Sequence, residues 1–145
     1  EKPVASGTLK PGNGWQEVKF DAPVKARFFC FEALSSQNDN DNAAIAEFYL
    51  LGENGKPLSR QHWQIAYADS EETRGGNFTA DKIFDLQEST YWSTARGDKY
   101  PHQVVIDLRE EVVVSGFQYL PRAEEGYPGM VKEYKAYTKM SPFKF

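Results

Sequence analysis

The chain has 145 residues, 40% of them hydrophobic and 26% charged, and its formal net charge is −4 at pH 7. This length and composition predict one globular domain with its own hydrophobic core. Because acidic and basic residues are scattered along the chain, the sequence favours neither a nucleic-acid partner nor an anionic membrane surface. No apolar run reaches transmembrane length, and residues 1–3 resemble neither a signal peptide nor an initiating methionine. We therefore expect a soluble, processed or excised piece of a longer protein.

The single cysteine, Cys30, excludes an internal disulfide. It lies in a phenylalanine-rich run, which favours a buried, inert thiol. A catalytic cysteine would need a positioned histidine, and neither His62 nor His102 belongs to a motif that links it to Cys30.

The first half of the chain alternates short apolar segments with turn-forming residues. Strand candidates lie at 15–20, 26–34 and 43–52, and Asp21-Ala22-Pro23 is expected to close the first of them. Residues 35–42 are entirely polar and predict an exposed loop whose tip meets solvent or a ligand.

The second half continues this pattern. Strand candidates lie at 63–67, 104–108, 112–120 and 131–137, and a helical turn is expected near 77–84. About eight strands with almost no helix predict an all-β fold, an antiparallel β-sandwich.

Several motifs carry a family resemblance: Phe84-Asp85, Ser89-Thr90-Tyr91-Trp92, and the runs 101–108, 116–122 and 129–134. Together they resemble the opening two-thirds of a factor V/VIII type C, or discoidin, domain. More narrowly, they resemble the family 32 carbohydrate-binding modules of bacterial glycoside hydrolases such as β-hexosaminidase (chitobiase). Residues 23–28 and 44–48 resemble the closing third of such a domain. The resemblance implies a galactose-binding-like jelly roll.

The order of these parts is inverted relative to the family. Residues 1–52 resemble the closing part, 53–62 form a connector, and 63–145 resemble the opening part. The chain is either a circular permutant or a piece cut across two tandem copies. We expect residues 1–145 to form one compact, monomeric domain. A swapped dimer results if the two parts instead pair between molecules.

The resemblance implies a structural calcium ion held by side-chain and backbone oxygens. The positions that match its ligands are the side chains of Asp85, Thr90 and Glu47, with the carbonyls of Ile83, Gln87 and Ala46 as additions. Oxygen ligands from a flexible turn suit a cation of this kind. From the residues alone, Asp85 could instead cap a turn and Glu47 could be a solvated edge residue.

The resemblance also implies a sugar site on the loops, where Arg122 matches the arginine of the family. Ser93 and Pro128 stand where a histidine and an asparagine are common. Nearby residues offer substitutes, and the candidate ligand-binding set is Arg122, Tyr127, Arg96, Tyr100, Asp98 and Asn42.

Structural roles compete with these assignments. Arg122 could form an ion pair with Glu124 or Glu125, and His102 is expected to be a hydrogen-bonded structural residue. Core packing is expected for the three tryptophans, Trp15, Trp63 and Trp92.

No catalytic triad, phosphate-binding glycine loop, zinc spacing or paired-carboxylate motif is present. The sequence therefore predicts a non-catalytic carbohydrate-binding module that recognises terminal galactose or N-acetylhexosamine sugars beside a neighbouring catalytic domain. The expected location is extracellular, periplasmic or on the surface of a bacterium. The alternative is a protein-contact or spacer module with a degenerate sugar site. Phospholipid binding is disfavoured by the negative net charge.

Overall fold

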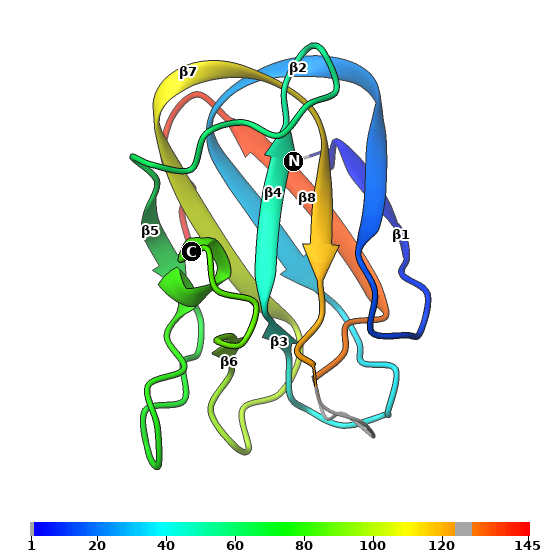
Figure 1. Ribbon diagram of the computed structural model, residues 1–145, viewed down its shortest axis with the longest axis vertical. Helices are drawn as coiled ribbons and strands as arrows, with labels where there is room; N and C mark the ends of the chain where they lie inside the picture. The colour runs from blue at the N-terminus through cyan, green and yellow to red at the C-terminus, as the bar shows by residue number, and fades with distance from the viewer. Residues whose placement is uncertain (1, 124–128) are drawn as a thin grey trace.

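Antiparallel strands make up nearly all of the regular structure, as the spacing of apolar segments and turn residues predicts (Figure 1). The computed structural model describes residues 2–123 and 129–145. The elements in this part of the chain are β1 (Ala5–Thr8), β2 (Gln16–Ala33), β3 (Ala44–Ile45), β4 (Glu47–Leu51), β5 (Gln64–Ala68), the 3-10 helix η1 (Ala80–Phe84), β6 (Trp92–Ser93), β7 (His102–Leu120) and β8 (Glu133–Lys139). No helix in these two ranges is long and apolar enough to cross a membrane.

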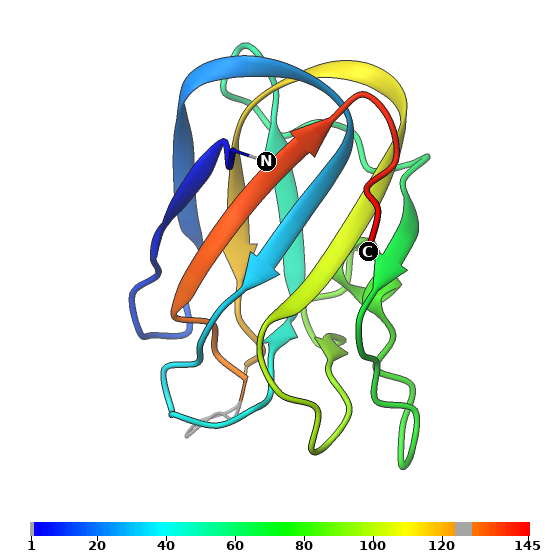
Figure 2. The ribbon, with the colours of Figure 1, turned by 180° about the vertical axis from the view of Figure 1, so that it is seen from behind.

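Two long strands carry the sheet. The order is β1-β8-β2-β7-β4, β5 also pairs with β7, and β3 and β6 form a separate two-stranded sheet. β4 pairs with the last residues of β7, and β5 pairs with its first residues. Figures 1 and 2 show β2 and β7 arching over one end of the molecule from one layer to the other. The predicted antiparallel β-sandwich is confirmed.

The long strands correct the predicted boundaries. Two separate strands were expected on either side of Asp21-Ala22-Pro23, and two more within 104–120, but the structure has one strand in each case. The pairing of β2 with β7 loses register between Lys19 and Val24, and resumes beyond it. Irregularities of this kind bend a sheet, and Pro23, which has no N–H, lies where the pairing is interrupted. The turn residues therefore bend the strand without ending it.

Aromatic rings from both layers meet in the core. The ring of Phe48 on β4 lies between two others. Its centroid is 5.3 Å from that of Phe31 on β2 and 5.1 Å from that of Phe117 on β7. All three are buried, as is Cys30, which confirms the expected burial of the thiol. These large rings pack against one another in the same core as buried aliphatic residues.

Two of the three tryptophan predictions are confirmed. Trp63 and Trp92 are buried, and Trp92 donates through Nε1 to the carbonyl of Ser70 at 2.9 Å. The prediction for Trp15 is wrong, because this side chain is 42% exposed. It precedes β2, and its ring lies against Tyr49 at a centroid distance of 5.6 Å.

The pairing also brings the chain ends into the same sheet. β1, near the start, pairs with β8, near the end, through Ala5 and Ala136 among other residues. The division of the chain into 1–52, 53–62 and 63–145, its inverted order, and the choice between monomer and swapped dimer stay predictions.

Candidate functional site

Loops gather at the end of the sandwich opposite the arches of β2 and β7 (Figure 1). Residues of these loops line a hollow of ≈ 770 Å³. Its walls combine two aromatic rings with arginines, acidic side chains and short polar groups. The lining residues are Asn40, Asp41, Asn42, Glu72, Arg74, Phe78, Tyr91, Ser93, Thr94, Arg96, Gly97 and Arg122.

Backbone hydrogen bonds fix these loops to one another. The N–H of Ser93 donates to the carbonyl of Phe78 at 3.1 Å, and the N–H of Glu72 donates to the carbonyl of Ser93 at 2.8 Å. On the other side, the N–H of Thr94 donates to the carbonyl of Ala43 at 2.9 Å. The short strand β6 is therefore the support to which the loops on both sides of the hollow are bonded.

Two stacked rings form the apolar wall. Phe78 and Tyr91 lie 4.9 Å apart between centroids with an interplanar angle of 14°. The guanidinium carbon of Arg122 lies 4.5 Å from the centroid of the Tyr91 ring, within range of a cation–π interaction. The arginine that matches the family is thus positioned by a tyrosine at the edge of the hollow.

Glu72 holds two arginine-bearing loops together. Its carboxylate accepts hydrogen bonds from the backbone N–H of Arg96 at 3.0 Å and of Arg74 at 2.9 Å. These two bonds hold the pKa of Glu72 below its usual range. The Arg74 side chain also pairs with Glu72, at 3.5 Å between Nε and Oε2. Glu72 is therefore a charged acceptor that orders the loops.

Asn42 has a structural role at the back of the hollow. Its amide nitrogen lies 3.0 Å from Ser93 Oγ and 3.0 Å from both oxygens of Thr94. Its amide oxygen is buried and has no hydrogen-bond partner among the described residues. The amide therefore joins the 35–42 loop to β6 and leaves one polar atom unsatisfied.

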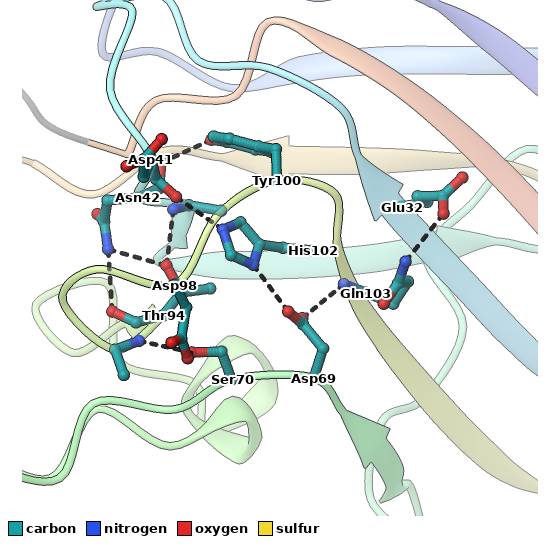
Figure 3. Close-up of polar contacts among 12 residues, drawn as sticks. Glu32, Asp41, Asn42, Asp69, Ser70, Thr94, Asp98, Tyr100, His102 and Gln103 are labelled. Atoms are coloured by element: carbon teal, nitrogen blue, oxygen red, sulfur yellow. Dashed lines mark hydrogen bonds and ion pairs between the residues drawn. The ribbon is translucent and has the colours of Figure 1, made fainter. Parts of the chain in front are cut away.

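Tyr100 and Asp98 belong to a network of polar contacts that also includes Asn42 and Ser70 (Figure 3). Tyr100 donates through its hydroxyl to the carbonyl of Asn42 at 2.5 Å, and Asp98 accepts a hydrogen bond from Ser70 at 2.6 Å. Neither residue is among those that line the hollow. Both support the loops that do.

His102 joins the same supporting network and is fully buried. Its Nδ1 lies 2.8 Å from Asp69 Oδ2 and its Nε2 lies 2.7 Å from the carbonyl oxygen of Asp41. Burial lowers the pKa of His102, but the bonds to Asp69 and Asp41 and the charges of Asp69 and Asp98 outweigh it, so the pKa lies above its usual range. The predicted structural role of this histidine is confirmed.

The predicted ligand set thus divides into three groups. Arg122, Arg96 and Asn42 line the hollow, whereas Asp98 and Tyr100 do not line it and instead bond to Ser70 and Asn42. Tyr127 lies outside the described residues, as do Glu124 and Glu125, the expected ion-pair partners of Arg122, and Pro128.

The lining residues absent from the predicted ligand set include Glu72, Arg74, Phe78 and Tyr91. One signal pointed to Tyr91, because side chains alternate along an extended segment and a core Trp92 turns its neighbour outward. Phe78 follows the Gly75-Gly76 pair, and nothing in the sequence pattern places it against Tyr91.

The predicted metal ligands gather in a different place, beside β4 and η1. Asp85 accepts a hydrogen bond from the N–H of Gln87 at 3.0 Å and another from the hydroxyl of Thr90. The carbonyl of Gln87 accepts from the same hydroxyl at 3.1 Å. Asp85 therefore closes the turn that follows η1, as the alternative interpretation expects.

Glu47 is 2% exposed, so its alternative interpretation as a solvated edge residue is wrong. It faces inward at the start of β4, where its carboxylate meets the guanidinium of Arg60 at 2.7 Å. Burial raises the pKa of Glu47 to about 7, the Arg60 hydrogen bond opposes the rise, and Asp85 adds to it.

The same guanidinium contacts a second predicted ligand. Nη1 of Arg60 donates to the carbonyl of Ile83 at 3.1 Å. Ala46, another predicted ligand, is held separately, because its N–H donates to the carbonyl of Leu120 at 2.9 Å. No group of three or more His, Cys, Asp or Glu side chains within 2–123 and 129–145 could hold a metal ion. As they are arranged, the residues do not fit a calcium ion at the expected position, because the charged end of Arg60 already lies among the ligands. Calcium binding stays a prediction.

Comparison with known proteins agrees with this fold. The F5/8 type C domain family matches residues 66–143, more than half of the chain. A sialidase from Micromonospora viridifaciens is 34% identical over 88 residues, which cover 58% of this chain and 13% of that protein. The chain belongs to the F5/8 type C domain family.

Proposed function

We propose that this chain is a non-catalytic carbohydrate-binding module that recognises terminal sugars of the galactose or N-acetylhexosamine type. The observation that carries the proposal is the stacked pair Phe78 and Tyr91 beside arginines in an open hollow on a rigid sandwich. Membership of the F5/8 type C family and the match to part of a sialidase support it.

The chemistry of the hollow suits a pyranose. An aromatic face packs against the C–H groups on one side of a sugar ring, and fixed donors and acceptors then select its hydroxyl groups. Arg122 and Arg96 supply N–H donors in a planar fork that matches neighbouring hydroxyls. Glu72 stays charged and can accept from a hydroxyl.

The protonation state of Glu72 argues against catalysis of glycoside hydrolysis in this hollow. A general acid needs a carboxyl group whose pKa is raised towards neutrality. The pKa of Glu72 is shifted in the opposite direction by the backbone N–H groups of Arg96 and Arg74. Binding without chemistry is the function that this arrangement supports.

We further infer that the module works beside the catalytic domain of a glycoside hydrolase, outside the bacterial cytoplasm or on the cell surface. The relative is called a sialidase, and the chain spans 13% of its length, which is the proportion expected of an accessory part. A β-hexosaminidase parent stays a prediction. Several weak modules on one enzyme would raise its avidity for a sugar-coated surface.

Calorimetric titration with galactose, N-acetylgalactosamine and N-acetylglucosamine tests the proposal. We expect a Kd on the order of millimolar to high micromolar for one of them, equivalent to roughly 4–6 kcal/mol. Arg122→Ala should abolish measurable binding, whereas Lys25→Ala, which removes an exposed cation from β2, should not change it. Absence of binding to every sugar on a glycan array would favour the protein-contact or spacer function instead.

A further inference from the structure

The buried arginine beside η1 has an environment that resembles a metal coordination shell. The Arg60 side chain is 3% exposed. One of its nitrogens, Nη1, lies 2.7 Å from Glu47 Oε1, 3.1 Å from the carbonyl oxygen of Ile83 and 3.2 Å from the carbonyl oxygen of Phe48. A single positively charged atom group is thus surrounded by one carboxylate and two carbonyl oxygens.

We propose that the Arg60 guanidinium is a built-in cation that takes the place of the calcium ion implied by the family resemblance, so that this domain keeps its fold without metal. Glu47 and Ile83 are two of the six predicted calcium ligands, and both already bind Arg60. The inference concerns stability and is independent of the proposed sugar site.

The guanidinium of Arg60 and a calcium ion would compete for the same oxygen atoms. Calcium lies 2.3–2.6 Å from its oxygen ligands, roughly the distance at which Nη1 meets Glu47. An ion bound to both Glu47 Oε1 and the Ile83 carbonyl would compete with the guanidinium for the two oxygens that it already contacts. Without displacement, two buried positive charges would lie side by side and repel each other.

The rest of the Arg60 side chain is also held in place. Its guanidinium carbon lies 3.7 Å from the centroid of the Tyr49 ring on β4, which is a close cation–π contact. The guanidinium keeps its charge when it is buried. Its hydrogen bonds to Glu47, Phe48 and Ile83 all come from Nη1, whereas Nε and Nη2 are buried and have no hydrogen-bond partner among the described residues. If the guanidinium left this position, Glu47 would remain a buried carboxylate without a countercharge, which is costly.

The contacts also explain what the cation does for the fold. Glu47 and Phe48 belong to β4, Ile83 belongs to η1, and Arg60 comes from the connector between β4 and β5. One side chain therefore joins three segments. The turn after η1 closes by its own hydrogen bonds to Asp85, without a contribution from the guanidinium.

Thermal unfolding of the unmodified chain in millimolar calcium chloride and in excess EDTA decides the matter. A ligand that binds only the folded state raises the Tm. We expect the same Tm in both solutions. A Tm that is higher in calcium than in EDTA would overturn the proposal, because the ion would then have a site of its own.

Two substitutions at the same position sharpen the test. Arg60→Met keeps an apolar stem without charge, and we expect its Tm in EDTA to fall by roughly 10 °C or more. Arg60→Ala empties the position, and calcium should recover part of its lost Tm. Lys56→Ala, which removes an exposed cation from the same connector, should match the unmodified chain.

Each variant has an outcome that counts against the proposal. A Tm of Arg60→Met equal to that of the unmodified chain would show that the charge is not needed. No gain for Arg60→Ala in calcium would show that the oxygens around the guanidinium are not a calcium site. If neither variant folds, Arg60→Lys replaces them, because it keeps a positive charge in a side chain of different shape. The Tm of the unmodified chain in calcium and in EDTA still tests the proposal.

Discussion

Two arginines in this domain lie over tyrosine rings, and they differ in what surrounds them. Arg60 is 3.7 Å from the ring centroid of Tyr49 and buried among the oxygens of β4 and η1. Arg122 is 4.5 Å from the ring centroid of Tyr91 and lines an open hollow. An arginine over a tyrosine ring is thus enclosed by the fold at one place and lines an open hollow at the other, where we propose that a sugar binds.

The difference teaches that burial and acceptors, more than residue type, decide the role of a guanidinium. A buried cation with a carboxylate partner is costly to disturb, because the remaining charge is left without water. A partly exposed cation on an aromatic ring costs little to remove and loses mainly ligand contacts. Substitutions at the two places should therefore separate stability from binding.

The largest effect is expected for Glu47→Ala. It removes the carboxylate partner of Arg60 and leaves a buried guanidinium bonded only to carbonyl oxygens. We expect the free energy of unfolding to fall by about 3–5 kcal/mol. Urea unfolding above pH 7, where Glu47 is charged, measures it, with the exposed Glu53→Ala as control. A loss no larger than that of the control would mean that the pair contributes nothing to stability.

The tyrosine pair compares the two regions directly. Tyr49→Leu removes a buried cation–π contact, and we expect a loss of about 1–3 kcal/mol of stability with sugar binding unchanged. Tyr91→Leu removes the stack with Phe78 and the support of Arg122, and should cost about 0.5–1.5 kcal/mol.

For Tyr91→Leu, the Kd for the sugar should also rise roughly tenfold or more, equivalent to about 1.4 kcal/mol. Calorimetric titration and urea unfolding of the same samples separate the two effects. Tyr67→Leu, on β5 and stacked with Phe145, is a matched control for loss of a surface ring. Equal changes in Kd for the Tyr49 and Tyr91 variants would remove the distinction between the two regions.

Sequence reasoning reached the fold more completely than the site. Segment spacing and turn residues predict the sandwich, but they divide β2 and β7 at positions where the strands only bend. Local sequence cannot show that pairing with a neighbouring strand resumes beyond Pro23. That depends on contacts between residues far apart in the chain.

The site shows the same limit. The family motifs predict that Arg122 is a ligand residue, and it does line the hollow. Nothing in the connector 53–62 predicts that Arg60 would reach Glu47 and Ile83, because this meeting depends on how β4 and η1 pack. Phe78 was missed for the same reason, since its partner Tyr91 lies 13 positions away in sequence.

A smaller effect is expected from pH, through the histidine that supports the hollow. The folded-state pKa of His102 is raised, so its protonation stabilises the fold fully below the unfolded value of 6.5. This contribution is lost as pH rises through the folded pKa. The charged and titratable groups around it are Asp69, Asp41, Asp98 and Tyr100.

Urea unfolding across this pH range should therefore show stability falling more steeply in the unmodified chain than in His102→Gln. Comparing the two profiles cancels the contributions of other groups, including Glu47. His62→Gln, which removes an exposed histidine outside this network, is the control variant. A profile of His102→Gln that runs parallel to the unmodified one would show that His102 does not change its charge state on unfolding.

The smallest effect is expected at the rim of the hollow, where Lys99 pairs with Asp41. Their charged atoms are 3.5 Å apart, with the side chains 80% and 52% exposed. An exposed pair of this kind is screened by water and salt, so Lys99→Ala should change the free energy of unfolding by less than about 1 kcal/mol. Asp41 is held from the other side by the bond between its carbonyl and His102, so the loop should keep its position and the sugar Kd should stay within about twofold. A larger rise in Kd, measured at low and high salt, would show that the rim charge itself contacts the ligand and that the open region depends on more than Arg122 and its tyrosine.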